Sequence, residues 1–259
     1  MTPQTKQVLI AVKAYPNPSR KYGETVCVAG VDISTHKWIR LYPIPYRDLD
    51  NEKKFAKYSL IEVKVRKATD DTRPESYKVD TGSIKILDQL DPKNNWEKRK
   101  PLILQTVSPS YCAILEESKQ NNKSLGMFKP ERVQFSFVKA PSKDTDKRES
   151  CYAQVDFLNK QQKRAIEDIP FDFRYSFYCG GKADCPGHDL AIIDWEINQS
   201  FRRWRSKYKT ETELLEKIKQ RWFNSMCSEE HDTYFFVGNM SRFRKIFMVL
   251  GTFYPKIEK

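Results

Sequence analysis

The chain lacks any apolar run long enough to cross a membrane as a helix. Its longest apolar runs, Val8–Val12 and Ile246–Gly251, have the length of strands, whereas a membrane-spanning helix needs about 20 apolar residues. The first residues, Met1–Lys6, also lack the basic, apolar and small-residue regions of an export signal. The sequence therefore predicts a cytoplasmic protein that has no membrane partner.

Glycine and cysteine are both scarce. The 259 residues include 9 glycines and 6 cysteines, while aromatic residues make up 13% of the chain. So many aromatic residues with so few glycines exclude a disordered, low-complexity basic protein. Six cysteines are too few for a disulfide scaffold, and in a reducing compartment clustered cysteines are more often metal ligands than bridges. The cysteines are therefore candidate metal ligands.

Common enzyme signatures are absent as well. The sequence has no GxxxxGKS/T phosphate loop, no GxGxxG fingerprint, no GxSxG elbow, and no HxE with PCxxC deaminase pair. Of the three histidines, His36 and His231 lie in turns without an evident catalytic partner. We expect binding rather than catalysis from such a chain.

Acidic residues are outnumbered by basic ones. Lys and Arg total 46 against 34 Asp and Glu, which gives a formal net charge of +12 and favours a polyanionic partner. The stretches Ser200–Thr210 (SFRRWRSKYKT) and Met240–Lys245 (MSRFRK) combine cations with aromatic residues and contain no acid, a composition suited to phosphates and unpaired bases. Trp204 is better explained as part of a buried helical stripe. The predicted nucleic-acid contacts are Arg202, Arg203, Arg205, Lys207, Lys209, Arg242 and Arg244, with Lys37, Trp38 and Arg40 on a strand near the N-terminus.

The first 92 residues have the pattern of a small β-barrel. Five short β-rich segments are separated by Pro, Gly and polar residues, and a polar loop is expected at Thr69–Thr81. This size and spacing are typical of an oligonucleotide/oligosaccharide-binding (OB) barrel. The predicted strands are Gln7–Ala14, Glu24–Asp32, Lys37–Pro43, Ser59–Lys67 and Ser83–Leu87.

A second β-rich unit is expected in residues 93–259. Because helical segments are also expected there, the predicted fold class is α+β. Helical segments between Asn94 and Lys119, interrupted by Pro101 and Pro109, would bridge the two units. Two helices are expected within Ile192–Ser225, the second opened by a Thr210–Glu213 capping box. The predicted strands of this unit are Glu131–Lys139, Phe171–Cys179, Thr233–Gly238 and Lys245–Phe253.

The strongest local signal is a Cys/His knuckle that follows a predicted strand. Cys179, Cys185 and His188 lie within ten residues (CGGKADCPGH), on a turn rich in Gly and Pro, and thiolates with an imidazole suit a thiophilic metal. Cys112, at the start of a predicted helix, is the preferred fourth ligand, and the alternatives are Cys151 and Cys227. Zn²⁺ is favoured by the histidine, a 4Fe–4S cluster is the alternative, and a knuckle that binds no metal is the simpler interpretation.

Asp194 and Glu196 follow the knuckle and are weak candidates for a catalytic Mg²⁺ site. A second acidic group lies in TDDTRPESYKVD, residues 69–80. The alternative is that Asp194 caps a helix and Glu196 interacts favourably with the helix dipole. We favour this structural interpretation because no nuclease spacing accompanies these acids.

Residues Val26–Ile44 (VCVAGVDISTHKWIRLYPI) resemble the N-terminal portion of prokaryotic dual OB-containing domain proteins. The later stretch Phe177–Glu196 is similar to cysteine-rich segments of proteins that carry the same module. The resemblance implies paired barrels and a nucleic-acid or mobile-element setting. The function predicted from these features is binding of single-stranded or irregular DNA or RNA, with a structural metal site. The alternatives are a metal-dependent nuclease or nucleic-acid-modifying enzyme, and an iron–sulfur sensor that binds a protein partner.

Overall fold

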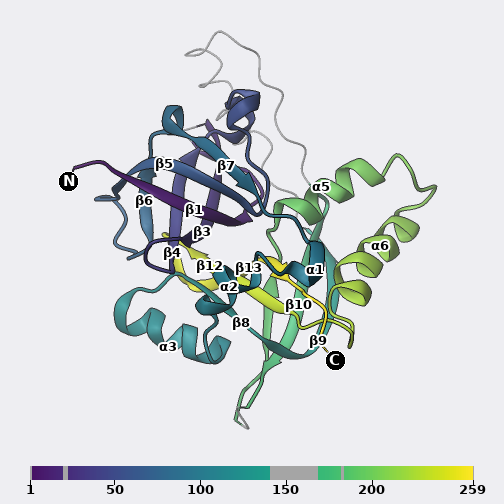
Figure 1. Ribbon diagram of the computed structural model, residues 1–259. Coiled ribbons are helices and arrows are strands. Elements are labelled where there is room, and N and C mark those ends of the chain that lie inside the picture. Colours follow the sequence, from purple (N-terminus) through teal and green to yellow (C-terminus); the bar gives the residue numbers. More distant parts are fainter. Residues whose placement is uncertain (1, 20–22, 141–168, 182–183, 259) are drawn as a thin grey trace.

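The N-terminal strands close into a five-stranded barrel (Figure 1). The computed structural model describes residues 2–19, 23–140, 169–181 and 184–258. The ring follows the order β1-β3-β4-β6-β5, and β5 returns to pair with β1. All neighbours are antiparallel except β4 and β6, which gives the Greek-key barrel expected of an OB-like fold. The ring strands are β1 (Gln4–Lys13), β3 (Gly23–Asp32), β4 (Lys37–Ile44), β5 (Ser59–Lys67) and β6 (Ser76–Val79).

The fifth strand of this ring is not the predicted one. The segment predicted as Ser83–Leu87 forms β7 (Lys85–Gln89), which pairs with β5 outside the ring and is exposed along its length. The fifth ring strand is β6, which lies in the segment predicted to be a polar loop. Its four residues (SYKV) carry no run of apolar side chains, so the sequence did not predict a strand there. Its backbone pairing with β4 and β5 holds it in the barrel. Three 3₁₀ turns (Tyr46–Asp48, Asn51–Lys53, Thr81–Ser83) and β2 (Asn17–Ser19) complete this unit.

The second unit is built of two three-stranded sheets, β11-β10-β9 and β13-β12-β8, whose connections repeat the strand order of the first unit. Strands β8 and β9, one residue apart, form one path in which β8 pairs with β12 and β9 pairs with β10. β10 pairs with β11, Ile192 beyond β11 bridges in parallel to Val249 of β13, and β13 pairs with β12. With β8 and β9 taken as one strand, the third and fifth strands are again the parallel neighbours. The strands are β8 (Leu125–Phe128), β9 (Pro130–Lys139), β10 (Phe171–Cys179), β11 (His188–Ala191), β12 (Tyr234–Met240) and β13 (Phe243–Phe253).

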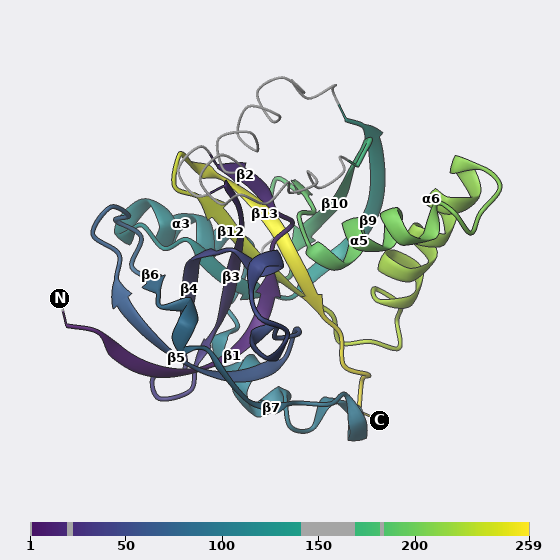
Figure 2. The ribbon, with the colours of Figure 1, turned by 90° about the horizontal axis from the view of Figure 1, so that it is seen from above.

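Helices connect and flank the barrels (Figures 1 and 2). The two helices predicted after the knuckle are present, between the third and fourth strand positions of the second barrel, and Thr210 Oγ1 accepts a hydrogen bond from Glu213 N (3.2 Å) as predicted. Within the described residues, no helix is long and apolar enough to cross a bilayer. The helices are α1 (Lys93–Trp96), α2 (Lys100–Ile103), α3 (Tyr111–Asn121), α5 (Trp195–Trp204) and α6 (Glu211–Lys219), with a 3₁₀ turn at Leu104–Thr106 and a π-helical turn at Gln220–Ser225.

The two barrels share a buried apolar interface. β1 is buried on both faces, because Val8 and Ile10 point into the first barrel while Leu9 and Ala11 belong to the cluster between the units. The outer face of β3 and β4 packs on the second unit, where the Trp38 ring lies edge-on to Phe236, 5.6 Å between centroids. The apolar run Val8–Val12 of this strand has no polar interruptions because both of its faces are covered.

Buried polar side chains also connect the barrels. Arg40 is 3% exposed and donates to the carbonyl oxygens of Asn239 (3.1 Å) and Ser124 (3.0 Å). Arg73 donates to the same Asn239 oxygen (2.7 Å), and Glu75 accepts from Ser124 N (2.9 Å). The predicted nucleic-acid contact at Arg40 is wrong, since its guanidinium is used between the units. Trp38 is half-buried and packs against the same apolar interface.

Candidate metal centre and basic surfaces

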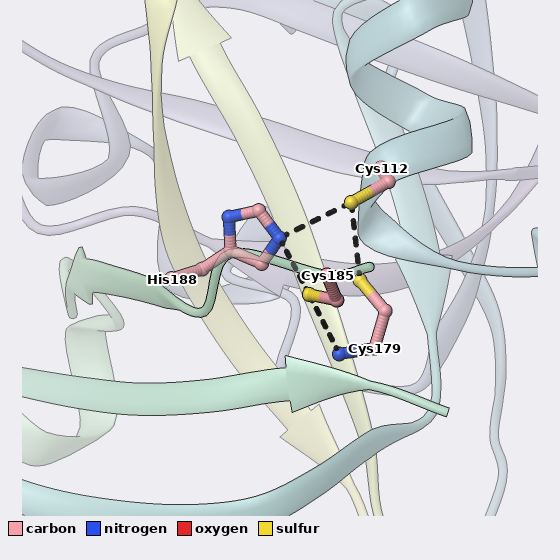
Figure 3. Close-up of side chains that lie close together, drawn as sticks. All are labelled: Cys112, Cys179, Cys185 and His188. Carbon is pink, nitrogen blue, oxygen red and sulfur yellow. Dashed lines mark hydrogen bonds between the residues drawn. The ribbon is translucent and has the colours of Figure 1, made fainter. Parts of the chain in front are cut away.

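Three thiols and an imidazole converge where α3, β10 and β11 meet (Figure 3). Cys112 lies in the first turn of α3, Cys179 ends β10, Cys185 lies in the following loop, and His188 begins β11. Their ligand atoms all lie within 4.8 Å of one another. The four residues that we predicted as ligands, including Cys112 as the fourth, could therefore hold a metal ion.

Local sequence explains how these side chains come together. In β10 every second residue from Phe171 to Cys179 is buried, so the strand period directs Cys179 inward. The chain then reverses through Gly181 and Gly187, whose φ angles of 68° and 79° favour glycine. Ser110 caps α3 by accepting a hydrogen bond from Ala113 N (3.1 Å), and this fixes the helical turn that carries Cys112.

The distances among the four residues fit a single ion. His188 Nε2 lies 3.3 Å from Cys112 Sγ and 3.4 Å from Cys185 Sγ, and the Sγ atoms of Cys112 and Cys179 are 3.6 Å apart. Metal bonds of about 2.3 Å to sulfur and about 2.1 Å to nitrogen give a tetrahedron with edges of about 3.6–3.8 Å. The thiols are too far apart for a disulfide and are free.

The surroundings of these thiols determine whether a cation must displace a proton when it binds. Burial, followed by the hydrogen bond to Cys179, raises the pKa of Cys112 to about 12. Burial opposes ionisation of Cys185 too, yet the N–H groups of Cys179 and Gly187 lower the pKa of Cys185. The His188 ring packs edge-on against Tyr111, 4.6 Å between centroids. Because burial favours the protonated form of Cys112, a bound cation would displace the proton of this thiol.

A hollow of about 400 Å³ reaches the centre from one side. Both Cys112 and His188 line it, and they are half-buried, so an ion has a route to these two ligands from solvent. The other residues that line the hollow are Ser110, Ala113, Leu115, Glu116, Lys119 and Pro186.

The alternative fourth ligands are not part of this group. The Cys227 thiol lies 3.8 Å from the carbonyl oxygen of Trp222, and burial raises its pKa to about 12. Cys151 lies outside the described residues. Within the described ranges, the Cys/His group is the one set of His, Cys, Asp and Glu side chains whose atoms are close enough to hold an ion.

Of the two acids after the knuckle, Asp194 has a structural role, while the Glu196 side chain is 49% exposed with its Oε2 3.8 Å from Lys57 Nζ. Asp194 is 4% exposed, and its Oδ1 accepts from Glu196 N (2.9 Å), which caps α5 as the preferred interpretation predicted. Its Oδ2 lies 3.5 Å from Lys57 Nζ in the first barrel, and burial raises the pKa of Asp194 to about 6. No local pattern pointed to Lys57, because it precedes Asp194 by 137 residues.

In the earlier acidic segment, Asp71 is paired with Arg73 and accepts from Ser76 Oγ (2.7 Å). Arg73 in turn bonds the second unit. This acid therefore supports the barrel interface.

The predicted basic residues fall into separate places. Figures 1 and 2 both show the α5–α6 connection on the side of the molecule away from the β12–β13 turn. Trp204 packs against Trp222 (5.9 Å between centroids), as expected of a buried stripe, and Arg202 is half-buried. The predicted contacts that are exposed to solvent are Lys37, Arg203, Arg205, Lys207, Lys209 and Arg242.

The β12–β13 turn is held firmly and presents apolar side chains to solvent. Arg244 is half-buried and donates to Asn122 Oδ1 at the end of α3 (2.8 Å) and to Thr72 Oγ1 of the first barrel (2.5 Å). Asn239 Nδ2 donates to the Arg244 carbonyl (2.7 Å). Arg244 therefore supports the turn, while Phe243 is 54% exposed. Met240 and Ile246 beside it are also exposed, and neither was among the predicted contacts.

Two family models match the chain. The one described as domain of unknown function (DUF8758) matches residues 4–105, which include the first barrel. The one described as domain of unknown function (DUF8757) matches residues 107–259, which include α3, the second barrel and all four Cys/His residues. No curated protein matches the chain.

Proposed function

The chain belongs to the DUF8757 family, and we propose that it binds single-stranded or irregular nucleic acid through the second barrel, which a zinc ion stabilises. The zinc ligands in this proposal are Cys112, Cys179, Cys185 and His188. The nucleic-acid surface is the β12–β13 turn, with the exposed cations of the α5–α6 connection as a second, electrostatic contact.

The observation that carries this proposal is the exposed aromatic ring at the β12–β13 turn. Phe243 is 54% exposed, and the two cations beside it in the turn, Arg242 and Lys245, are exposed as well. Burying such a ring is favourable, and a nucleobase can cover it by stacking while the cations neutralise the flanking phosphates. Because Arg244 and Asn239 fix the turn, little conformational entropy would be lost on binding.

The fold supports the same surface. In OB barrels, oligonucleotides bind at loops that include the one between the fourth and fifth strands. The β12–β13 turn occupies that position in the second barrel. The resemblance of Val26–Ile44 to dual OB-containing domain proteins and the net charge of +12 also favour a polyanionic partner.

Zinc is favoured over an iron–sulfur cluster by the ligand spacing. A cluster with four irons bonds each protein ligand to a different iron, so its ligands surround a larger object than one ion. Ligand atoms within 4.8 Å of one another match a single ion better. Three thiolates and one imidazole are an ordinary structural zinc set, with no position left open for a substrate.

The metal-dependent nuclease is the less favoured alternative. Asp194 is buried and paired with Lys57, and its other oxygen caps α5. A catalytic carboxylate would need to reach a metal ion and a phosphate, which this arrangement does not allow without unpairing Lys57.

The proposal is tested by variants of the β12–β13 turn. Binding of labelled oligothymidine and of the matching RNA is measured by fluorescence anisotropy over a range of salt concentrations. We expect Phe243→Ala to weaken binding by roughly 5- to 100-fold with little change in the salt slope, because stacking is lost and charge is kept. Arg242→Glu with Lys245→Glu should reduce the slope by roughly 0.7 for each lost phosphate contact.

The control is Lys85→Glu with Lys93→Glu, which changes the net charge equally at lysines whose side chains are 72% and 83% exposed. Equal losses in the control and the turn variants would show that only overall charge matters. Absence of binding by the wild type at low salt would refute the proposed function.

A further inference from the structure

On the outer face of the second barrel's β9–β10–β11 sheet, the outward side chains of β10 are half-buried or exposed among the described residues. On it the Tyr178 side chain of β10 is 39% exposed. The Arg132 guanidinium of β9 lies over this ring, 4.4 Å from Cζ to the ring centroid. Arg132 is itself exposed and forms no ion pair with any described residue, whereas Arg174 on the same face is paired with Asp189 (2.8 Å).

Arg132 lies at a β-bulge, and its backbone conformation determines the direction of its side chain. The register of β9 against β10 shifts here, with Gln134 opposite Ser176 but Glu131 opposite Tyr178, so β9 carries an extra residue. Arg132 has a φ of 48°, in the left-handed region that favours glycine. β-Bulges of this kind redirect side chains next to functional sites, and strained backbone is retained where the side chain is needed.

The loop between Cys179 and His188 contacts the Tyr178 ring, the partner of Arg132. Tyr178 directly precedes the ligand Cys179, and Gly187 directly precedes the ligand His188. A Cβ at Gly187 would lie 3.2 Å from Tyr178 Cε1 and Cζ, so the glycine lets the loop approach the phenol end of the ring. A metal bound at the centre would thus fix the segments on both sides of this contact.

We propose that the Arg132 guanidinium, packed on Tyr178, is a stacking site for an unpaired nucleobase of a single strand. This inference rests on the proposed function and adds a second contact to it. The Cζ atom of the guanidinium lies over the phenol ring, and Arg132 as a whole is exposed to solvent. A base stacks on the guanidinium, and the guanidinium charge attracts the adjacent phosphate. A base pair within a duplex presents no free face, so the site favours single strands.

The test uses two substitutions at Arg132 that separate its charge, its shape and its backbone. Arg132→Lys keeps the charge but loses the plane, so we expect roughly 5- to 50-fold weaker binding of labelled oligothymidine with an unchanged salt slope. Arg132→Gly suits the left-handed backbone, so it should weaken binding similarly while the melting temperature stays the same or rises. Tyr178→Leu should lower the affinity less than either. Arg66→Lys, at an exposed arginine of β5, is the matched control and should bind as the wild type does.

The outcomes separate this inference from the proposed function. If the wild type binds single strands and Phe243→Ala weakens binding, but both Arg132 variants bind normally, the stacking site is wrong and the proposed function stands. If Arg132→Gly lowers the melting temperature markedly, Arg132 is structural, and normal affinity of Arg132→Lys would confirm that. A wild type that binds no single strand would overturn both.

Discussion

Of the four residues that could hold a metal ion, Cys112 alone comes from outside the knuckle, 76 residues before His188. It joins α3 to β10 and β11, whereas the other three ligands lie within one strand–loop–strand segment. A site with three ligands left keeps some affinity for zinc, but it loses the bond that ties the helix to the barrel.

We predict that Cys112→Ser lowers the zinc content after dialysis against a chelator from about one ion per chain to a small fraction of that. Zinc is measured by mass spectrometry of the metal in purified protein. Because protons compete for the thiolates, the variant should also lose its zinc at a higher pH than the wild type when the pH is lowered. Cys227→Ala removes a buried thiol outside the group and should keep the full content. Equal zinc in both variants would assign the fourth ligand elsewhere.

At the scale of elements, the cap of α3 links helix stability to the metal centre. Ser110 accepts from Ala113 N (3.1 Å) at the start of α3, and Thr210 accepts from Glu213 N (3.2 Å) at the start of α6. Loss of either cap costs about 1 kcal/mol of folding free energy. Only α3 carries a ligand in its first turn.

We therefore expect Ser110→Ala and Thr210→Ala to destabilise the protein by similar amounts in urea denaturation. Zinc affinity, measured by competition with a chromogenic chelator, should fall several-fold in Ser110→Ala and stay unchanged in Thr210→Ala. A fall of equal size in both variants would mean that general stability, and not the position of Cys112, controls zinc affinity.

The sequence predicted those strands in which buried and less buried side chains alternate regularly. β5 and β10 match the predicted Ser59–Lys67 and Phe171–Cys179, because alternate side chains point into a barrel. The four-residue strands β6, β8 and β11 were missed, since their place depends on backbone pairing with distant strands. The Cys/His group that could hold an ion was predictable because three of its residues are close in sequence and the fourth lies at the start of a helix.

The surface predictions depended on information that local sequence does not contain. Arg40 and Arg203 both lie within two residues of a tryptophan, in stretches with further cations and aromatic residues, yet the first is buried between the barrels and the second is exposed. The difference arises from which barrel face the second unit covers. The exposed pair Arg132 and Tyr178 was missed because the bulge that aligns them is visible only in the strand register.

At the scale of the whole molecule, the two barrels of one strand order are held together by an apolar interface that encloses a charged pair. Lys57 of the first unit and Asp194 of the second are both nearly buried, with Nζ and Oδ2 3.5 Å apart. Gly251 of β13 lies beside this pair: a Cβ there would be 2.9 Å from Lys57 Nζ and 3.0 Å from Asp194 Oδ2. The absence of a side chain at this position is what lets the ion pair form between the barrels.

We predict that Gly251→Ala destabilises the protein by about 1–3 kcal/mol, because the methyl group overpacks the site and pushes the two buried charges apart. Urea denaturation followed by tryptophan fluorescence and by far-UV circular dichroism measures the change. Gly82→Ala is the control: its Cβ would meet only Asp80 Oδ1, at 3.3 Å, and should change stability by less than about 0.5 kcal/mol. If Gly251→Ala were as mild as the control, the pair would have room to move and would contribute little to holding the barrels together. A loss of the predicted size with unchanged zinc content would place the effect at the interface and not at the metal centre.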